Sequence, residues 1–180
     1  MIPPAMSHAG SWLCREYAMQ NLEILTGNII GAAIAVHREL GAGLLESAYE
    51  ACLRHELSSR GLHVERQKAL PIRYKGIELD CGYRLDLVVD ANVIVELKAV
   101  RTVEEIDKAQ ILSYLKLSGY PLGLLINFNV PLLKNGIKRY INARNDRDPV
   151  EVTARPEERW VREHTGTKND QGVSGAGSVS

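Results

Sequence analysis

The chain has 180 residues, of which 45% are hydrophobic and 24% are charged, close to the ~45–50% and ~25% of ordinary soluble proteins. This length fits one domain with its own core, and the composition excludes a collagen-like repeat, a coiled-coil rod and disorder throughout. The 22 basic residues cancel the 22 acidic residues, so any contact with a polyanion must come from a local patch.

Three cysteines, Cys14, Cys52 and Cys81, occur without a CxxC pair or any other paired spacing. Such usage indicates neither a disulfide framework nor a zinc site. We identify no apolar run that approaches the ~18 residues of a membrane span, and no basic start followed by the apolar core of a secretory signal. We therefore expect a cytoplasmic protein with no zinc and no membrane contact.

The composition divides the chain into three parts. Residues 1–19 show no apolar periodicity, so we expect an irregular N-terminal extension. The periodic segments lie within residues 20–143, which we expect to form the folded domain. Residues 144–180 begin with alternating charges and end rich in Gly and Ser, so burial cannot offset the entropy of ordering them. We predict that they form a flexible tail.

Two helices are predicted at the start of the folded domain. Apolar residues recur at helical spacing from Ile29 to Leu40, and Gly41 is a good helix terminator. A second apolar stripe with the same spacing runs from Leu45 to Leu57. Both stripes predict helices that bury one face.

The chain then changes to the period of strands. Short β-rich runs over 69–74, 81–89 and 93–97 predict three strands. Helical spacing returns over 104–117, and the apolar run 122–128 predicts a buried strand. This order of elements predicts an α/β fold with a mixed central sheet flanked by helices.

The two strands around the predicted turn at 90–92 carry the most informative pattern. With a period of two, Leu85, Leu87 and Val89 share one apolar face, while Asp86 lies on the other. A three-residue turn sets a register that places Asp86 directly across from Glu96. Like charges in that relation destabilise a sheet, so the pair indicates a cation between them.

Oxygen ligands with open positions suit Mg²⁺ or Mn²⁺. In the same register Lys98 faces Arg84, on the side of both carboxylates, where an ammonium acts on a metal-bound water or on phosphate charge. On the following helix, Gln110 and Tyr114 lie one turn apart. Plainer interpretations stay open, because a solvated strand face and a satisfied core amide give the same patterns.

These residues together resemble the PD-(D/E)XK nuclease superfamily, with Asp86 on one strand, Glu96-Leu97-Lys98 on the next and Gln110-Ile111-Leu112-Ser113-Tyr114 on the helix that follows. Within the superfamily the chain is similar to the bacterial GxxExxY proteins, whose motif here is Gly43-Leu44-Leu45-Glu46-Ser47-Ala48-Tyr49. The resemblance covers roughly residues 22–143. It implies a restriction-endonuclease-like core.

The resemblance also implies roles for single residues. Asp86 and Glu96 would be metal ligands and Lys98 the catalytic lysine, with Glu46 as a further acidic ligand. Gln110 and Tyr114 would order the site and the DNA backbone, and Arg84 is a candidate phosphate contact. The implied activity is Mg²⁺- or Mn²⁺-dependent hydrolysis of phosphodiester bonds, with DNA as the expected nucleic acid. Three scattered cysteines cannot hold the iron–sulfur cluster of some relatives.

Other functions stay open at this stage. A catalytically silent module on the same fold would bind nucleic acid or protein. A small metal-dependent phosphoesterase would act on a nucleotide or RNA, and a structural role is the plainest option. Many members of the superfamily cut duplexes as dimers, so a homodimer fits the resemblance, although nothing in the sequence specifies an interface.

Overall fold

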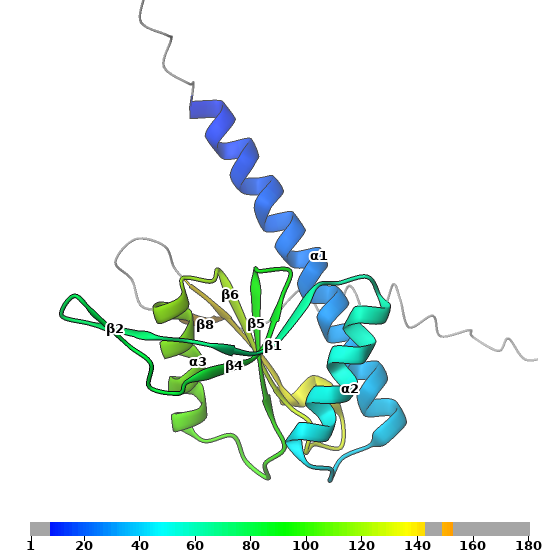
Figure 1. The fold of residues 1–180 in the computed structure, drawn as a ribbon. Helices are drawn as coiled ribbons and strands as arrows, with labels where there is room; N and C mark the ends of the chain where they lie inside the picture. The colour runs from blue at the N-terminus through cyan, green and yellow to red at the C-terminus, as the bar shows by residue number, and fades with distance from the viewer. Residues whose placement is uncertain (1–7, 143–148, 153–180) are drawn as a thin grey trace, which may run out of the picture.

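Three helices and a six-stranded sheet set the frame of the molecule (Figure 1). The computed structural model describes residues 8–142 and 149–152. Helices α1 (His8–Leu40) and α2 (Glu46–Ser59) cover one face of the sheet, and α3 (Glu105–Ser118) covers the other. The fold is therefore the predicted α/β class, with helices on both faces of a mixed sheet.

The sheet has the order β1-β4-β5-β6-β7-β8, and its neighbours are antiparallel except for the parallel pair β5–β6. Its strands are β1 (Val64–Ala69), β4 (Arg84–Val89), β5 (Val93–Lys98), β6 (Leu122–Asn127), β7 (Ile137–Ile141) and β8 (Val150–Val152). A separate hairpin, β2 (Ile72–Tyr74) with β3 (Ile77–Leu79), is inserted between β1 and β4, and the 3₁₀ helix η1 (Leu133–Gly136) precedes β7. Helix α3 joins the parallel strands, as parallel pairing requires.

Strands β5 and β6 form the centre of the core. All six residues of β6 and the first five of β5 are buried. On one face they pack with residues of α1 and α2 such as Ile29 and Leu53, and on the other face with Ile111 and Leu115 of α3. Strands covered on both faces have continuous apolar sequences, which explains why both were recognisable from sequence.

The loop between α1 and α2 is closed by a buried tyrosine. The Tyr49 hydroxyl donates a hydrogen bond to the carbonyl oxygen of Gly41 (2.7 Å) and accepts one from the N–H of Leu44 (3.1 Å). Its ring stacks on Phe128, with 4.4 Å between ring centroids. Gly43 in this loop has a φ of 99°, which residues with a side chain rarely adopt. The loop thus fixes where α2 begins.

Helix α1 begins at His8, so residues 8–19 of the predicted irregular extension are helical. They contain no proline and include Ala, Leu, Arg, Glu and Met, so intrinsic propensity continues the helix without apolar periodicity. Met19–Leu40 is also long and apolar enough to cross a membrane, by length and composition alone, contrary to the expectation of no such run. Buried residues such as Leu25 and Ile29 supply part of that apolar character, and core helices of soluble proteins pass the same test.

The strands differ from the prediction at several places. Pro71 has no N–H to donate, so the predicted strand 69–74 is divided between the end of β1 and the start of the hairpin. Strands β1, β3 and β7 were not predicted, and β4 begins at Arg84, so residues 81–83 of the predicted strand 81–89 lie outside it. In the predicted flexible tail, Val150–Val152 pairs with β7 at the edge of the sheet. Residues 143–148 and 153–180 lie outside the described part of the chain.

The substitution Tyr49→Phe removes both hydrogen bonds of the α1–α2 loop and keeps the stacked ring. We expect the free energy of unfolding to fall by about 1–2 kcal/mol, because a buried N–H and a carbonyl lose their partner. Urea denaturation followed by circular dichroism measures the change. Tyr17→Phe is the matched control, since Tyr17 is 68% exposed. Equal stability of both variants would contradict a structural role for the Tyr49 hydroxyl.

Candidate active site

The candidate site lies where β4 and β5 separate. Backbone pairs such as Leu87–Val95 have the predicted register, but the ladder stops at that pair. Beyond it, Asp86 Oδ2 accepts a hydrogen bond from the N–H of Leu97 (2.8 Å). The Asp86 side chain thus takes the place of a backbone acceptor, which holds its carboxylate in the gap between the strands.

The alternation of side chains breaks at the same place. Leu85 was predicted to share a face with Leu87, but Leu85 packs on the α3 side of the sheet. Opposite Asp86 in β1, Gln67 has a φ of 50°, a conformation that costs roughly 1–3 kcal/mol for a residue with a side chain. Gln67 Nε2 donates to Asp86 Oδ1 (3.4 Å) and to Glu50 Oε1 (3.1 Å). The distortion therefore joins Asp86 to a carboxylate on α2.

Glu96 and Lys98 form an ion pair at the end of β5. Lys98 Nζ lies 3.0 Å from Glu96 Oε1, and the Glu96 side chain is only 2% exposed. The second oxygen, Oε2, is buried and has no hydrogen-bond partner in the described part of the chain. A buried carboxylate oxygen without a partner is costly and uncommon. This unsatisfied oxygen is an observation that a bound cation would explain.

Helix α3 brings the predicted glutamine and tyrosine to this ion pair. Gln110 Oε1 accepts a hydrogen bond from Lys98 Nζ (3.1 Å), and Gln110 Nε2 donates to the Tyr114 hydroxyl (2.7 Å). Asp107 Oδ1 lies 3.9 Å from Lys98 Nζ, and Asp107 Oδ2 accepts from the N–H of Glu104 (2.9 Å) as part of the capping box of α3. The start of α3 is thus tied to the lysine.

Helix α2 supplies two carboxylates from one face, because Glu46 and Glu50 are four residues apart. Glu46 was predicted and lies at the exposed first position of α2. Glu50 was not predicted. It is buried and accepts hydrogen bonds from Arg66 Nε (2.6 Å) and from Gln67. An acidic residue beside Tyr49 on an otherwise apolar stripe was the sequence signal that would have found it.

The carboxylates of the site are close together and partly shielded from water, so their charged forms are disfavoured. Burial, followed by the charge of Asp86, raises the pKa of Glu96 to about 7 and raises the pKa of Glu46. Burial also raises the pKa of Asp86, against the hydrogen bond from Leu97. Burial acts to lower the pKa of Lys98, but the neighbouring carboxylates raise it above its usual value. Lys98 is therefore an ammonium, and a further cation would relieve the excess charge.

The donors of the site fit a hard divalent cation in their chemistry. Asp86, Glu96 and Glu46 offer only carboxylate oxygens, which Mg²⁺ and Mn²⁺ prefer, and Glu96 Oε2 lacks any other partner. Within residues 8–142 and 149–152, however, no three His, Cys, Asp or Glu side chains converge on one ion position. Mg²⁺ is usually held by one or two carboxylates with water and phosphate oxygens, so the chemistry of Asp86 and Glu96 is compatible with such an ion.

Arg84 does not neutralise the carboxylates. Its guanidinium Nη1 donates to the carbonyl oxygen of Gln67 (3.3 Å), and its side chain is exposed beside the site. Arg84 and Lys98 are not a backbone pair either, because the β4–β5 ladder has ended before them. Arg84 thus remains a cation at the edge of the site, where a phosphate can reach it.

The fold and site together define a class of protein. A mixed sheet carries Asp86 on one strand and Glu96 and Lys98 on the next, and the following helix adds Gln110 and Tyr114. A family model described as the PD-(D/E)XK nuclease superfamily matches residues 23–140, about two-thirds of the chain, and the chain belongs to this superfamily. Searches among curated proteins and among solved structures found no match.

The raised pKa of Glu96 predicts a pH dependence of stability in the absence of metal. The folded state binds a proton on Glu96 up to about pH 7, whereas the unfolded value is 4.5, so this residue costs stability as the pH rises from 4.5 to 7. At pH 8, the free energy of unfolding of Glu96→Gln should therefore exceed that of wild type by roughly 3 kcal/mol. At pH 4.5 the two proteins should unfold at nearly the same urea concentration. Glu39→Gln, at an exposed position of α1, is the control. A constant difference between pH 4.5 and 8 would contradict the raised pKa.

Proposed function

We propose that this chain is a divalent-metal-dependent nuclease that hydrolyses phosphodiester bonds, with DNA as substrate. One observation carries the proposal: the buried Glu96 has one oxygen on Lys98 and a second oxygen with no partner, beside Asp86. Membership of the chain in the PD-(D/E)XK nuclease superfamily supports the same reaction. A solvated strand face would leave neither carboxylate buried.

We also propose that the chain is a GxxExxY protein within the superfamily. Each residue of that motif has a part in the geometry. Gly43 adopts the positive φ of the loop, Tyr49 closes the loop with its hydroxyl, and Glu46 begins α2 on the side of the carboxylates. The spacing of the motif thus corresponds to a glycine in the loop, a glutamate at the start of the helix and a tyrosine about one helical turn later.

Asp86 and Glu96 would hold Mg²⁺ or Mn²⁺, with Glu46 as a further acidic ligand whose charge acts on Glu96. The bound ion would supply Lewis-acid polarisation of the phosphate and a lowered pKa for water. The residues that orient these ligands are in place. Leu97 and Gln67 hold Asp86, and Glu50 holds Gln67. Such outer contacts typically change metal affinity by about 10–100-fold when removed.

Lys98 acts on the phosphate as a fixed positive charge. In hydrolysis, the oxygen of water forms a new bond to phosphorus, the bond from phosphorus to the leaving oxygen breaks, and the leaving oxygen gains a proton. The carboxylates keep Lys98 protonated, so it donates hydrogen bonds to a nonbridging phosphate oxygen and stabilises the developing charge. Gln110 positions Lys98, and Tyr114 positions Gln110.

Metal binding should release protons and depend on Asp86. In calorimetry with Mn²⁺, we expect binding to the wild type at pH 7 with a heat that changes with the buffer, because part of Glu96 is protonated before binding. Asp86→Asn should abolish binding, and Gln67→Ala should weaken it by about tenfold. Glu39→Gln is the control. If Asp86→Asn and the wild type bind Mn²⁺ with equal affinity, Asp86 is not a metal ligand.

Cleavage should depend on metal and on Lys98. We expect labelled DNA to be cut with Mg²⁺ or Mn²⁺ and not with EDTA, and Lys98→Ala to lower kcat by about 100-fold or more, the typical effect of one lost electrostatic donor. Single-stranded, duplex and branched DNA and RNA are tested side by side. Lys134→Ala, which removes an exposed lysine of η1, is the control. If the wild type cuts none of these and binds no Mn²⁺, the chain is a binding module on a nuclease fold.

A further inference from the structure

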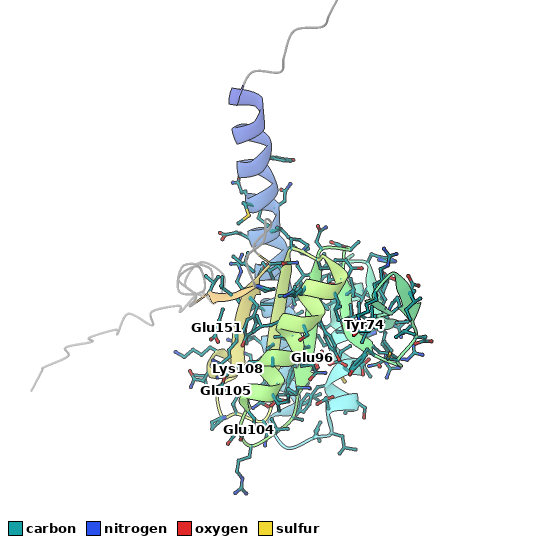
Figure 2. The ribbon with its side chains drawn as sticks, turned by 90° about the vertical axis from the view of Figure 1, so that its left-hand side faces the viewer. Tyr74, Glu96, Glu104, Glu105, Lys108 and Glu151 are labelled. Carbon is teal, nitrogen blue, oxygen red and sulfur yellow. The ribbon has the colours of Figure 1, made fainter. Side chains whose placement is uncertain are left out.

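A two-stranded arm projects from the sheet beside the candidate site. It comprises residues 70–83, and its strands β2 and β3 are joined by Lys75 and Gly76, with φ of 48° and 85°. Neither strand belongs to the six-stranded sheet, and no residue of either strand is in a core cluster. Figure 1 shows the arm extending away from the sheet, and in Figure 2, where this side faces the viewer, Tyr74 is labelled to the right of Glu96. Leu70, at the root of the arm, belongs to the core, whereas the two strands of the arm do not.

One face of the arm is apolar and uncovered. The backbone pairs Ile72–Leu79 and Tyr74–Ile77 place these four side chains on one face, because alternate residues of a strand share a face. Tyr74 and Ile77, which flank the turn, are 57% and 56% exposed. A two-stranded hairpin is only marginally stable in water by itself. Grouped apolar side chains in such a position are typical of a binding surface.

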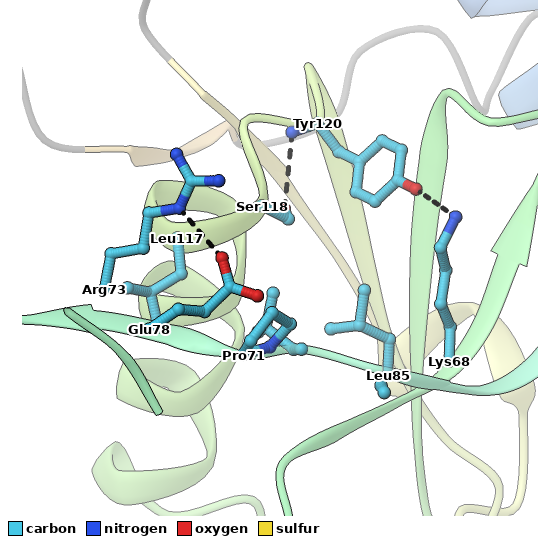
Figure 3. A pocket seen from close by; sticks show the side chains of 10 residues that line it. Lys68, Pro71, Arg73, Glu78, Leu85, Leu117, Ser118 and Tyr120 are labelled. Carbon is cyan, nitrogen blue, oxygen red and sulfur yellow. Dashed lines mark hydrogen bonds and ion pairs between the residues drawn. The ribbon is translucent and has the colours of Figure 1, made fainter. Parts of the chain in front are cut away.

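The opposite face of the arm borders an open hollow (Figure 3). Arg73 and Glu78 form an ion pair on this face (3.3 Å), and with Leu117 and Ser118 of α3 they line a hollow of about 420 Å³. The arm is therefore attached at its root, where β1 pairs with β4, and not along its length. Both of its faces remain accessible to a partner.

The charges around the site indicate the side from which a polyanion arrives. Glu104, Glu105 and Asp107 gather at the start of α3. On the arm side, Lys75 lies over the Tyr74 ring, 5.4 Å from its centroid, and Arg84 contacts a carbonyl oxygen. Within the described part of the chain, neither cation pairs with a carboxylate. The arm also carries Glu78 and Asp80 beside Arg73 and Lys75, so attraction of a phosphate backbone would come from Lys75 at the turn and from Arg84, and not from the net charge of the arm.

We infer that the arm enters a groove of a double-stranded nucleic acid whose scissile phosphate lies in the candidate site, an inference that rests on the proposed nuclease function. From Ala69 at the root to Lys75 at the turn, the extended chain reaches about 20 Å, less than the ~34 Å of one turn of B-form DNA. The turn therefore meets the same duplex within one helical turn of the site.

The chemistry of the turn favours a duplex as the partner. A two-stranded β-ribbon fits the major groove of B-form DNA. Exposed apolar side chains inserted between base steps, with cations on the neighbouring phosphates, are a common way to hold a deformed duplex. Tyr74 and Ile77 supply the apolar side chains, and Lys75 between them supplies the cation. A single strand offers no groove for this ribbon.

The test measures binding of a labelled duplex of about three helical turns to the full chain carrying Lys98→Ala, so that the duplex stays intact. We expect Tyr74→Ala to weaken duplex binding about tenfold. Lys75→Ala should lower the slope of log affinity against log salt by about 1. Arg54→Ala, which removes an exposed arginine from α2, is the matched control and leaves affinity unchanged. Circular dichroism confirms that each variant is folded.

Each alternative outcome overturns a separate statement. If the wild type cuts duplex DNA and the arm variants bind as tightly as Arg54→Ala, the arm inference is wrong and the nuclease stands. If the wild type neither cuts nor binds any nucleic acid, the proposed function itself fails. Equal losses on duplex and single strand contradict insertion into a groove. If the chain sediments as a dimer, and Ile77→Ser dissociates that dimer without changing DNA affinity, then the apolar face is an interface between two copies of the chain.

Discussion

The hydrogen bond from the N–H of Leu97 to the carboxylate of Asp86 is the contact on which the site depends. It ends the β4–β5 ladder and satisfies a backbone donor that the separating strands would leave unpaired. It also fixes one oxygen of Asp86 while the other faces Gln67. The same contact that lets the strands diverge therefore holds the Asp86 carboxylate in the opening.

The buried and crowded carboxylates of the site lower the stability of the fold, and the rest of the structure compensates. Glu96 and Glu50 are buried, and Asp86 and Glu46 lie close enough to raise the pKa of Glu96. Lys98 pairs with Glu96 and Arg66 with Glu50, which leaves Asp86 and Glu46 without an ion pair in the described part of the chain, and Gln67 adds backbone strain. The dense apolar packing of β5 and β6 between two helix layers supplies the stability that such a site costs. The crowded carboxylates of the site are the observation on which the proposed cation site rests.

The helices and strands that could be predicted are those whose residue pattern has a single structural explanation. Helices α2 and α3 have apolar stripes, and β5 and β6 are continuous apolar runs because helices cover both of their faces. Strand β1 was missed because Arg66 and Gln67, which serve the site, interrupt its alternation. The first part of α1 was missed because propensity alone, without burial, continues that helix.

The site could be predicted in part for a similar reason. Alternation and the length of the turn sufficed to bring Asp86 near Glu96 and Lys98. The position of Leu85 could not be predicted, because it follows from the left-handed backbone of Gln67 opposite Asp86. The role of Glu50 could not be predicted, because it depends on which face of α2 packs against the sheet, and only the tertiary structure shows that. Local pattern thus identified the candidate groups Asp86, Glu96 and Lys98, and only the assembled structure shows the residues that contact them.

The length of α1 has a practical consequence. A helix of 33 residues is about 50 Å long, and among its described side chains the buried ones begin only at Leu25. Figure 1 shows the first part of this helix standing clear of the sheet. That part continues the axis of the segment that packs on the sheet, and Tyr17 on it is 68% exposed. A fluorophore at position 17 would therefore report the orientation of α1 without disturbing the core or the carboxylates of the candidate site.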